Sequence, residues 1–221
     1  MKLTLLANII TCAGALVGFV YGAFRFFRPK AAVYTQMVTF ACLVILFGRL
    51  YQIIRIVTVG ELAERFHLGV LGMIGSILFL FAANFGVMDS LVDDGSKELR
   101  KYRLIPLAAP ALVLAAWLAI FCFADDSIPT KIVTGVISVC VMLASYFNLK
   151  HLIIPDVAFG VIRSIRQYNL LALIYEFLCF AEMIAQIRNR EIITLIVGIL
   201  AGILLPFIIL SVDRGGKKWS V

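Results

Sequence analysis

Glu176 is a carboxylate near the middle of an apolar segment, residues 168–187. An ionisable side chain at this depth in a bilayer costs on the order of 3 kcal/mol or more, so it marks a candidate functional site by default. Side chains three, four and seven residues apart share one face of a helix, and the face that contains Glu176 is polar. This polar face contains Asn169, Ala172, Glu176, Cys179, Met183 and Gln186, and it is flanked by Tyr175 and Glu182. Because the opposite face is wholly apolar, we expect the polar face to point into the protein and the apolar face to contact lipid.

A carboxyl group in this position has two kinds of chemistry open to it. In a low-dielectric interior, a carboxyl group without a cationic partner is expected to stay protonated. Glu176 could then donate a hydrogen bond to a neighbouring helix and fix how the two helices pack. It could equally face a wet cavity, where it would bind a cationic or hydroxylated ligand or exchange a proton. The sequence favours neither interpretation.

Other polar residues are predicted to accompany Glu176. Glu182 lies nearer the outer surface and is expected to form a structural salt bridge with Arg49 or Arg55. Asn84, near the end of another apolar segment, is expected to hydrogen-bond between helices. The predicted ligand-binding set is Glu176, Tyr175, Asn169, Glu182, Gln186, Arg49, Arg55 and Asn84.

The groups needed for metal or covalent chemistry are not arranged for it in the sequence. The two histidines, His67 and His151, are far apart and near the ends of apolar segments. The cysteines all lie within apolar segments and are predicted to be small buried residues: Cys12, Cys42, Cys122, Cys140 and Cys179. We therefore predict no metal site, no cofactor and no catalytic residues, which argues against an enzyme without excluding one.

The composition indicates a membrane protein. Of the 221 residues, 62% are hydrophobic and 15% are charged, and the mean hydropathy is +1.03. A soluble domain is typically about half apolar and a quarter charged, so this excess of apolar surface must contact lipid. Seven segments approach the roughly 20 apolar residues that a bilayer requires. They span about residues 3–24, 31–50, 68–90, 104–123, 128–148, 168–187 and 191–212, and together they predict one all-α, compact seven-transmembrane-helix bundle over residues 1–221.

Charge asymmetry predicts how the bundle is oriented. Residues 25–30, 91–103 and 149–167, together with the tail after residue 212, contain most of the 20 lysines and arginines. Loops rich in Lys and Arg stay on the cytoplasmic side, so we expect an outside N-terminus and a cytoplasmic C-terminus. The net charge of +7 is then explained by contact with anionic lipid headgroups, and no nucleic acid is needed. Compact loops without Asn-x-Ser/Thr sites favour a bacterial plasma (inner) membrane.

Small residues predict where the helices pack. Gly14, Gly18 and Gly22 recur every four residues, and Gly198 and Gly202 show the same spacing. Such faces let helices in lipid approach closely, within the chain or as the face of a homo-oligomer.

Two further elements are predicted outside the spans. Residues 156–167 have the pattern of an amphipathic helix in the inner headgroup plane, and residues 49–66 are expected to extend the second helix outward.

Three functions remain open from the sequence. The leading hypothesis is a receptor-like seven-helix protein that binds a small or amphiphilic ligand in an intramembrane cavity and signals through a separate cytoplasmic partner. The second is a small secondary transporter with Glu176 as the proton-coupling or cation-coupling site, near the midplane where such sites usually lie. The third is a lipid-modifying membrane enzyme, for which the sequence offers no nucleophile–base pair.

Overall fold

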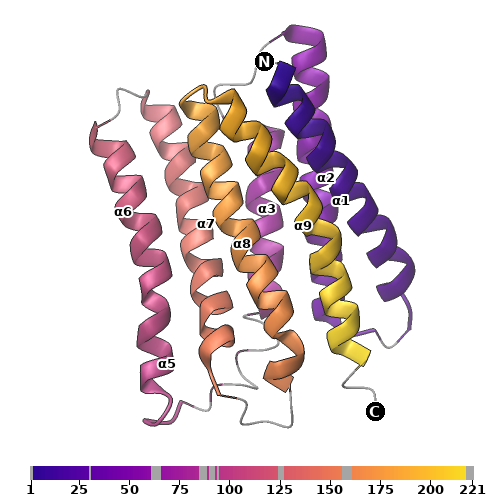
Figure 1. Ribbon diagram of the computed structural model, residues 1–221, viewed down its shortest axis with the longest axis vertical. Helices are drawn as coiled ribbons and strands as arrows, with labels where there is room; N and C mark the ends of the chain where they lie inside the picture. The colour runs from indigo at the N-terminus through magenta and orange to yellow at the C-terminus, as the bar shows by residue number, and fades with distance from the viewer. Residues whose placement is uncertain are drawn as a thin grey trace.

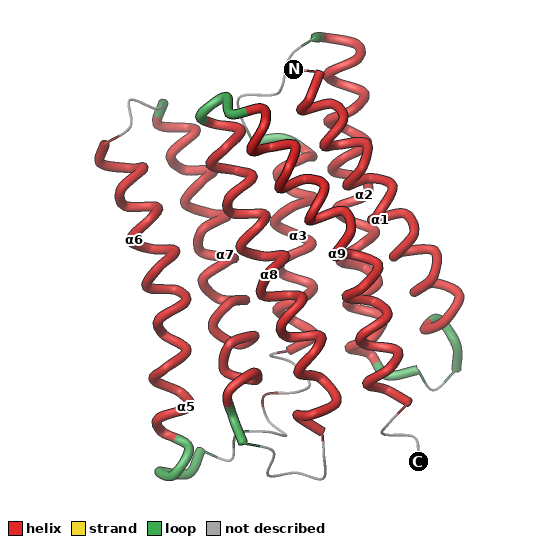
Figure 2. The backbone as a smooth tube through the Cα atoms, viewed as in Figure 1, coloured by secondary structure: helices red, strands yellow, loops and turns green. Residues whose placement is uncertain are grey.

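The structure is a computed structural model in which every regular element of the described chain is helical (Figure 2). It describes residues 2–29, 31–60, 66–84, 89, 93, 95–123, 127–155 and 161–217. The helices are α1 (Lys2–Phe26), α2 (Val33–Val59), α3 (Leu68–Ala83), α5 (Arg100–Leu104), the 3-10 turn η2 (Ile105–Leu107), α6 (Ala108–Phe123), α7 (Ile128–Ile153), α8 (Val161–Ile187) and α9 (Glu191–Lys217). The predicted all-α class is confirmed.

Six stretches of helix are long and apolar enough to cross a membrane. They are Lys2–Phe26, Val33–Val59, Arg100–Phe123, Ile128–Ile153, Ile165–Ile187 and Glu191–Gly215. The third predicted segment, residues 68–90, is described as the shorter apolar helix α3 of 16 residues, and residues 85–88 and 90 lie outside the described residues. These helices support a multi-span helical membrane protein.

Six helices enclose a common interior. Contacts between neighbours run from α1 to α2, α3, α7, α8, α9 and back to α1, which closes a ring. The helix α6 packs on α7 outside this ring, at the left edge of Figure 1. Its side chains Leu112, Leu114 and Leu118 are exposed, as expected of a surface that contacts lipid. The N-terminal end of α1 and the C-terminal end of α9 lie at opposite ends of the bundle (Figure 1).

The glycine faces pack inside the chain. A Cβ atom on Gly14 would collide with the carbonyl oxygen of Gly202, so α1 and α9 approach each other backbone to backbone. Gly18 and Gly22 are buried, and a Cβ atom on Gly22 would collide with Thr39 of α2. Close helix packing through these residues is therefore confirmed. The alternative of a homo-oligomer face at the same three glycines finds no support here, because α9 and α2 already pack against them.

Most helices extend beyond the apolar segments that predicted them. Helix α2 continues to Val59, where Gly60 caps it with φ 83° and its N–H donates to the carbonyl of Ile56, so the predicted extension over residues 49–66 is present as far as Val59. Helix α8 begins at Val161, so residues 161–167 form its first turns, whereas an in-plane helix was predicted there. Residues 156–160 of that prediction lie outside the described residues. Hydropathy marks only the part of a helix that crosses hydrocarbon, and the backbone hydrogen bonds continue beyond it.

Candidate functional site

The ring interior contains a buried ion pair between α2 and α8. Arg49 Nη1 and Nη2 each donate to one oxygen of Glu182 at 2.5 Å, and the two side chains are 2% and 0% exposed. Arg49 Nη1 also lies 3.0 Å from Asn8 Oδ1 of α1 and 3.3 Å from Gln52 Oε1. Gln186 Nε2 donates to Glu182 Oε1 at 3.1 Å. The predicted salt bridge of Glu182 is confirmed with Arg49 as its partner, and it joins three helices.

The second arginine considered for this pair lies elsewhere. Both oxygens of Glu182 are occupied by Arg49, and Arg55 is placed between Arg49 and the end of α2 at Val59. The Nε of Arg55 is buried and has no hydrogen-bond partner in the described part of the chain. Geometry thus places Arg55 outside the polar group that Arg49 and Glu182 form.

Two tyrosines of α8 make the next contacts along the interior. Tyr175 is 1% exposed, and its hydroxyl lies 3.0 Å from Ser76 Oγ of α3. The hydroxyl of Tyr168 donates to the carbonyl oxygen of Leu80 at 3.1 Å. Asn169 is fully buried, and neither polar atom of its side chain has a hydrogen-bond partner among the described residues. The polar face of α8 therefore points inward along its length, as the sequence predicted.

Glu176 itself has no cationic partner among the described residues. It is 0% exposed, and its Oε1 accepts a hydrogen bond from Asn148 Nδ2 of α7 at 2.6 Å. Its Oε2 is buried and has no hydrogen-bond partner within the described residues. Asn148 Oδ1 in turn accepts from Asn84 Nδ2 at 2.5 Å.

This series of hydrogen bonds continues to a histidine. His151 Nδ1 lies 3.4 Å from Asn84 Oδ1, and His151 Nε2 lies 3.2 Å from Asp89 Oδ1. We call the four residues Glu176, Asn148, Asn84 and His151 the amide chain. It connects α8, α7 and α3, and all four side chains are fully buried.

The amide chain ends at a group of charged residues, which we call the charged cluster: Asp89, Asp93, Arg103 and Lys150. Lys150 Nζ lies 2.6 Å from Asp89 Oδ1 and 2.8 Å from Asp93 Oδ2, and Arg103 Nε lies 3.3 Å from Asp93 Oδ2. Two anionic and two cationic groups thus face one another at the end of α7, next to His151.

Both carboxylates of the charged cluster are held in the ionised form. Burial acts to raise the pKa of Asp89, but hydrogen bonds from His151 and Lys150 outweigh it and hold the pKa below the ordinary value. Burial likewise acts to raise the pKa of Asp93, and hydrogen bonds from Lys150 and the Gly95 N–H lower it below the ordinary value. Two fixed negative charges therefore face Lys150 and His151 at neutral pH.

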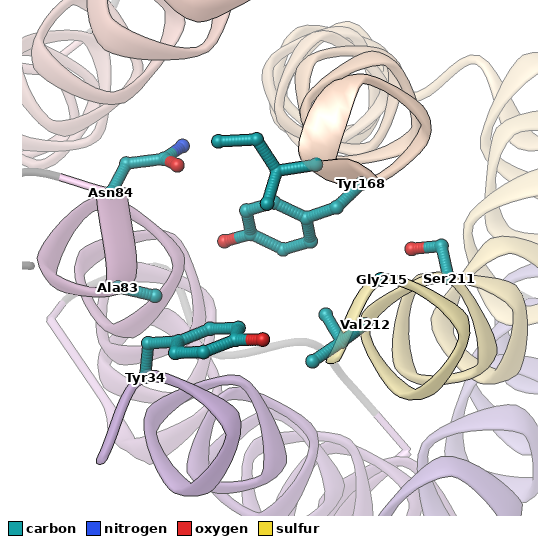
Figure 3. A pocket seen from close by; sticks show the side chains of 8 residues that line it. Tyr34, Ala83, Asn84, Tyr168, Ser211, Val212 and Gly215 are labelled. Atoms are coloured by element: carbon teal, nitrogen blue, oxygen red, sulfur yellow. The ribbon is translucent and has the colours of Figure 1, made fainter. Parts of the chain in front are cut away.

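A small cavity lies beside the amide chain, between α2, α3, α8 and α9 (Figure 3). It is lined by Tyr34, Ala83, Asn84, Ile165, Tyr168, Ser211, Val212 and Gly215. Its volume is about 10 Å³, which is close to the least space that one water molecule needs. Asn84 belongs both to this lining and to the amide chain, so the cavity touches the chain at Asn84.

The predicted site residues form separate groups. Arg49, Glu182 and Gln186 form the ion-pair group, whereas Glu176 and Asn84 meet through Asn148. Tyr175 bonds to Ser76, and Asn169 and Arg55 belong to neither group. Their role in ligand binding stays a prediction.

Sequence reasoning missed the contribution of α7. Asn148 and His151 connect Glu176 to the charged cluster, yet neither was predicted to belong to the site. The signal was present, because Thr134, Ser138 and Ser145 precede them on one buried face of the same helix at helical spacing. On α1, Asn8 was missed in the same way, between the buried Thr4 and Thr11.

The arrangement fits proton and ion-pair chemistry inside a membrane protein. Over the described ranges, no group of three or more His, Cys, Asp or Glu side chains is placed to hold a metal ion. No protein-family model, no curated protein and no solved structure matches this chain. The class of protein therefore has to be argued from the fold and the buried polar groups alone.

Proposed function

We propose that this protein is a small proton-coupled secondary transporter of the bacterial plasma membrane, with Glu176 as the residue that gains and loses a proton. The observation that supports this proposal is the contrast between the two buried glutamates of α8. Glu182 has both oxygens bound to Arg49, whereas Glu176 has one neutral hydrogen-bond donor and one oxygen without a partner among the described residues.

This contrast assigns different chemistry to the two carboxyl groups. A bidentate guanidinium holds a carboxylate in its charged form, so Glu182 serves as a fixed structural anion. An uncompensated charge in a protein interior costs several kcal/mol, by an order-of-magnitude estimate, so Glu176 has no such fixed state. A carboxyl group that is poised between its neutral and charged forms, deep in a membrane bundle, is what proton coupling requires.

The position of the amide chain supports a route for the proton on one side of Glu176. The chain leads from α8 through Asn148 and Asn84 to His151 and the charged cluster at the end of α7. In the other direction along α8, the Arg49–Glu182 pair occupies the interior. Transport by alternating access requires that only one side be open at a time, and this asymmetry is consistent with that requirement.

The seven-span topology and its orientation are parts of the same proposal. The 16 residues of α3 reach about 24 Å at 1.5 Å per residue, which is less than the roughly 30 Å hydrocarbon core. We count α3 as a seventh span because it lies within the ring and runs opposite to α2 and α6, the spans before and after it in the sequence (Figure 1). The C-terminal end of α9 and the connection from α1 to α2 lie at one end of the bundle (Figure 1). Arg25 in the last turn of α1 and Lys150 in the last turn of α7 lie near that end, which we assign to the cytoplasm.

The receptor hypothesis takes second place because of the size of the cavity beside the site. Pockets for small organic ligands are typically about 300–1,000 Å³, whereas the cavity next to the amide chain has room for about one water molecule. An alternating-access carrier is expected to pass through a closed conformation, in which no cavity large enough for the solute is present. A lipid-modifying enzyme has less support still, since no nucleophile–base pair accompanies Glu176 in the described residues.

An uptake assay tests the proposal. Purified protein is reconstituted in liposomes with an imposed pH gradient and offered radiolabelled small amines and polyols, the cationic and hydroxylated solutes that a carboxyl group can bind. The proposal predicts gradient-driven accumulation of at least one solute by the wild type and none by Glu176→Gln. Equal accumulation by both proteins contradicts the role of Glu176. Binding without accumulation, together with a co-purifying cytoplasmic protein, supports the receptor hypothesis.

A further inference from the structure

The two carboxamides of the amide chain have a definite polarity. A carboxamide nitrogen only donates and its oxygen only accepts. Asn84 Nδ2 donates to Asn148 Oδ1, and Asn148 Nδ2 donates to Glu176 Oε1, so both amides point their donors toward Glu176. If both amides turn by 180°, every contact is kept with donor and acceptor exchanged. The same four side chains therefore have two complete hydrogen-bonding arrangements.

In the arrangement of the structure, His151 is surrounded by acceptors. Its Nδ1 faces Asn84 Oδ1, and its Nε2 faces the carboxylate of Asp89. Both ring nitrogens must carry hydrogens to make these bonds, which defines the imidazolium form. At the other end of the chain, Glu176 Oε1 accepts from Asn148, so this arrangement needs no proton on Glu176. It therefore accommodates an ionised Glu176 together with a charged His151.

In the reversed arrangement both ends are neutral. Asn84 Nδ2 would donate to His151 Nδ1, which must then be bare, while His151 Nε2–H still donates to Asp89. Asn148 would present its oxygen to Glu176, which must then carry a proton on Oε1 in order to donate. With Glu176 ionised in the first arrangement, the two arrangements contain the same number of protons. Between them, an N–H bond at His151 Nδ1 breaks, the electron pair stays on nitrogen, and an O–H bond forms at Glu176.

We infer that His151 is a second proton-binding site of this protein, coupled to Glu176 by the amide chain so that the two residues share one proton. The inference rests on the proposed role of Glu176 as the proton site. The carboxamides set the coupling through their orientation and do not themselves conduct the proton. The cavity beside Asn84 has room for about one water molecule, which could contact the chain only at Asn84.

The groups around His151 allow both of its charge states. Asp89 bonds its Nε2 from the segment after α3, and Lys150 precedes it on α7. Asp93 and Arg103 complete the charged cluster, and Glu176 faces it from α8 through the two amides. Because two carboxylates and two cations balance one another in the cluster, His151 can be neutral or cationic without a large local excess of charge.

Coupled sites titrate as a pair, and this gives a direct test on the full-length wild-type protein in lipid nanodiscs. Histidine-labelled protein is followed by nitrogen NMR, which reports the fraction of His151 with a proton on Nδ1; the His67→Gln variant assigns the other histidine. Infrared absorption of the protonated carboxyl group, assigned with Glu176→Gln, reports the protonated fraction of Glu176. We expect the two fractions to add to about one over a plateau of pH. Full protonation of both groups together on this plateau, or two independent single-site titration curves, overturns the inference.

A set of variants separates the amide chain from through-space electrostatics. With the chain intact, Glu176→Gln removes the anion that favours the imidazolium, so the midpoint of His151 should fall by about one pH unit, a tenfold change in proton affinity. With Asn84→Ala the chain is broken, and this shift should largely disappear. A shift of the same size in the Asn84→Ala background overturns the inference.

Ser138→Ala is the matched control for these variants. It removes a polar side chain of α7 whose hydroxyl donates to the carbonyl of Thr134, outside the amide chain. It should leave the relation between the two fractions unchanged. If Asn84→Ala fails to fold, the wild-type titration, assigned with His67→Gln and Glu176→Gln, still decides. None of these measurements needs a transported solute. The titrations can therefore contradict the coupling to His151 while Glu176-dependent uptake is observed, and uptake can be absent while the coupling is observed.

Discussion

The Arg49–Glu182 pair should contribute more to the stability of this protein than any other ion pair described in it. The perturbation is Glu182→Gln, which keeps the size of the side chain and removes its charge. Arg49 then loses two charge-assisted hydrogen bonds of 2.5 Å and keeps its contacts with Asn8 and Gln52. The glutamine also points an N–H group at one of the guanidinium nitrogens, where the structure needs an acceptor.

The magnitude follows from the burial of the pair. Arg49 is 2% exposed and Glu182 is 0% exposed, so the arginine charge that remains has no access to water. Removing one partner of a buried pair typically costs about 3–5 kcal/mol, because the other charge is left uncompensated. Even the lower figure changes the ratio of folded to unfolded protein by roughly a hundredfold.

Reversible unfolding in mixed detergent–lipid micelles, followed by circular dichroism, measures this loss as a difference in the free energy of unfolding. Asp213→Asn is the matched control, since it breaks the Arg25–Asp213 pair of 2.6 Å, in which the arginine is 37% exposed and can turn to water or headgroups. We expect the control to lose far less than Glu182→Gln. The double change Arg49→Met with Glu182→Leu should recover much of the loss, because neither charge of this pair then remains buried. A loss below about 1 kcal/mol for Glu182→Gln, the range of an exposed pair, would refute this reasoning.

Two further predictions follow from the packing and the charged cluster. Gly14→Ala should lower the free energy of unfolding by about 1–3 kcal/mol in the same assay, because the added methyl group meets the backbone of Gly202. Ala13→Val, at an exposed neighbouring position, should change the free energy of unfolding little. Equal losses in the two variants would contradict the close contact of α1 and α9. The pKa of Asp89 lies below its ordinary value of 3.8 in the folded protein, so its stabilising contribution is present above that pH and is lost as the pH falls through the folded pKa. The free energy of unfolding should therefore be higher for the wild type than for Asp89→Asn at neutral pH, and this difference should disappear in acid. A difference that does not depend on pH would contradict the bond between Asp89 and Lys150.

Much of the fold could be predicted from the sequence, because lipid imposes a simple rule on each segment. A run of about 20 apolar residues must satisfy its own backbone in hydrocarbon, so it forms a helix whatever its neighbours do. The glycine spacing of α1 and α9 likewise indicated a close contact, and the structure shows Gly14 against Gly202. The partner of that contact could not be predicted, since spacing alone does not distinguish a helix of the same chain from one of a second copy.

The site was predicted only in part. The polar face of α8 and the charge of Glu182 were enough to predict a pairing with Arg49 or Arg55, and the structure shows Arg49 as the partner. The connection of Glu176 to Asn148 depends on which helices are neighbours in the ring, and periodicity within one segment does not determine that. The ring places α7 between α3 and α8, and this arrangement brings Asn84, Asn148 and Glu176 into one hydrogen-bonded series.

The central claim is that Glu176 exchanges a proton while Glu182 stays ionised. An infrared titration of the intact protein in lipid bilayers tests this most directly, with Glu176→Gln and Glu182→Gln to assign the protonated carboxyl absorption. The account predicts an absorption that varies reversibly with pH while the protein stays folded, that is missing in Glu176→Gln and that persists in Glu182→Gln. An absorption that does not vary with pH in the folded protein, or one that belongs to Glu182, would contradict it.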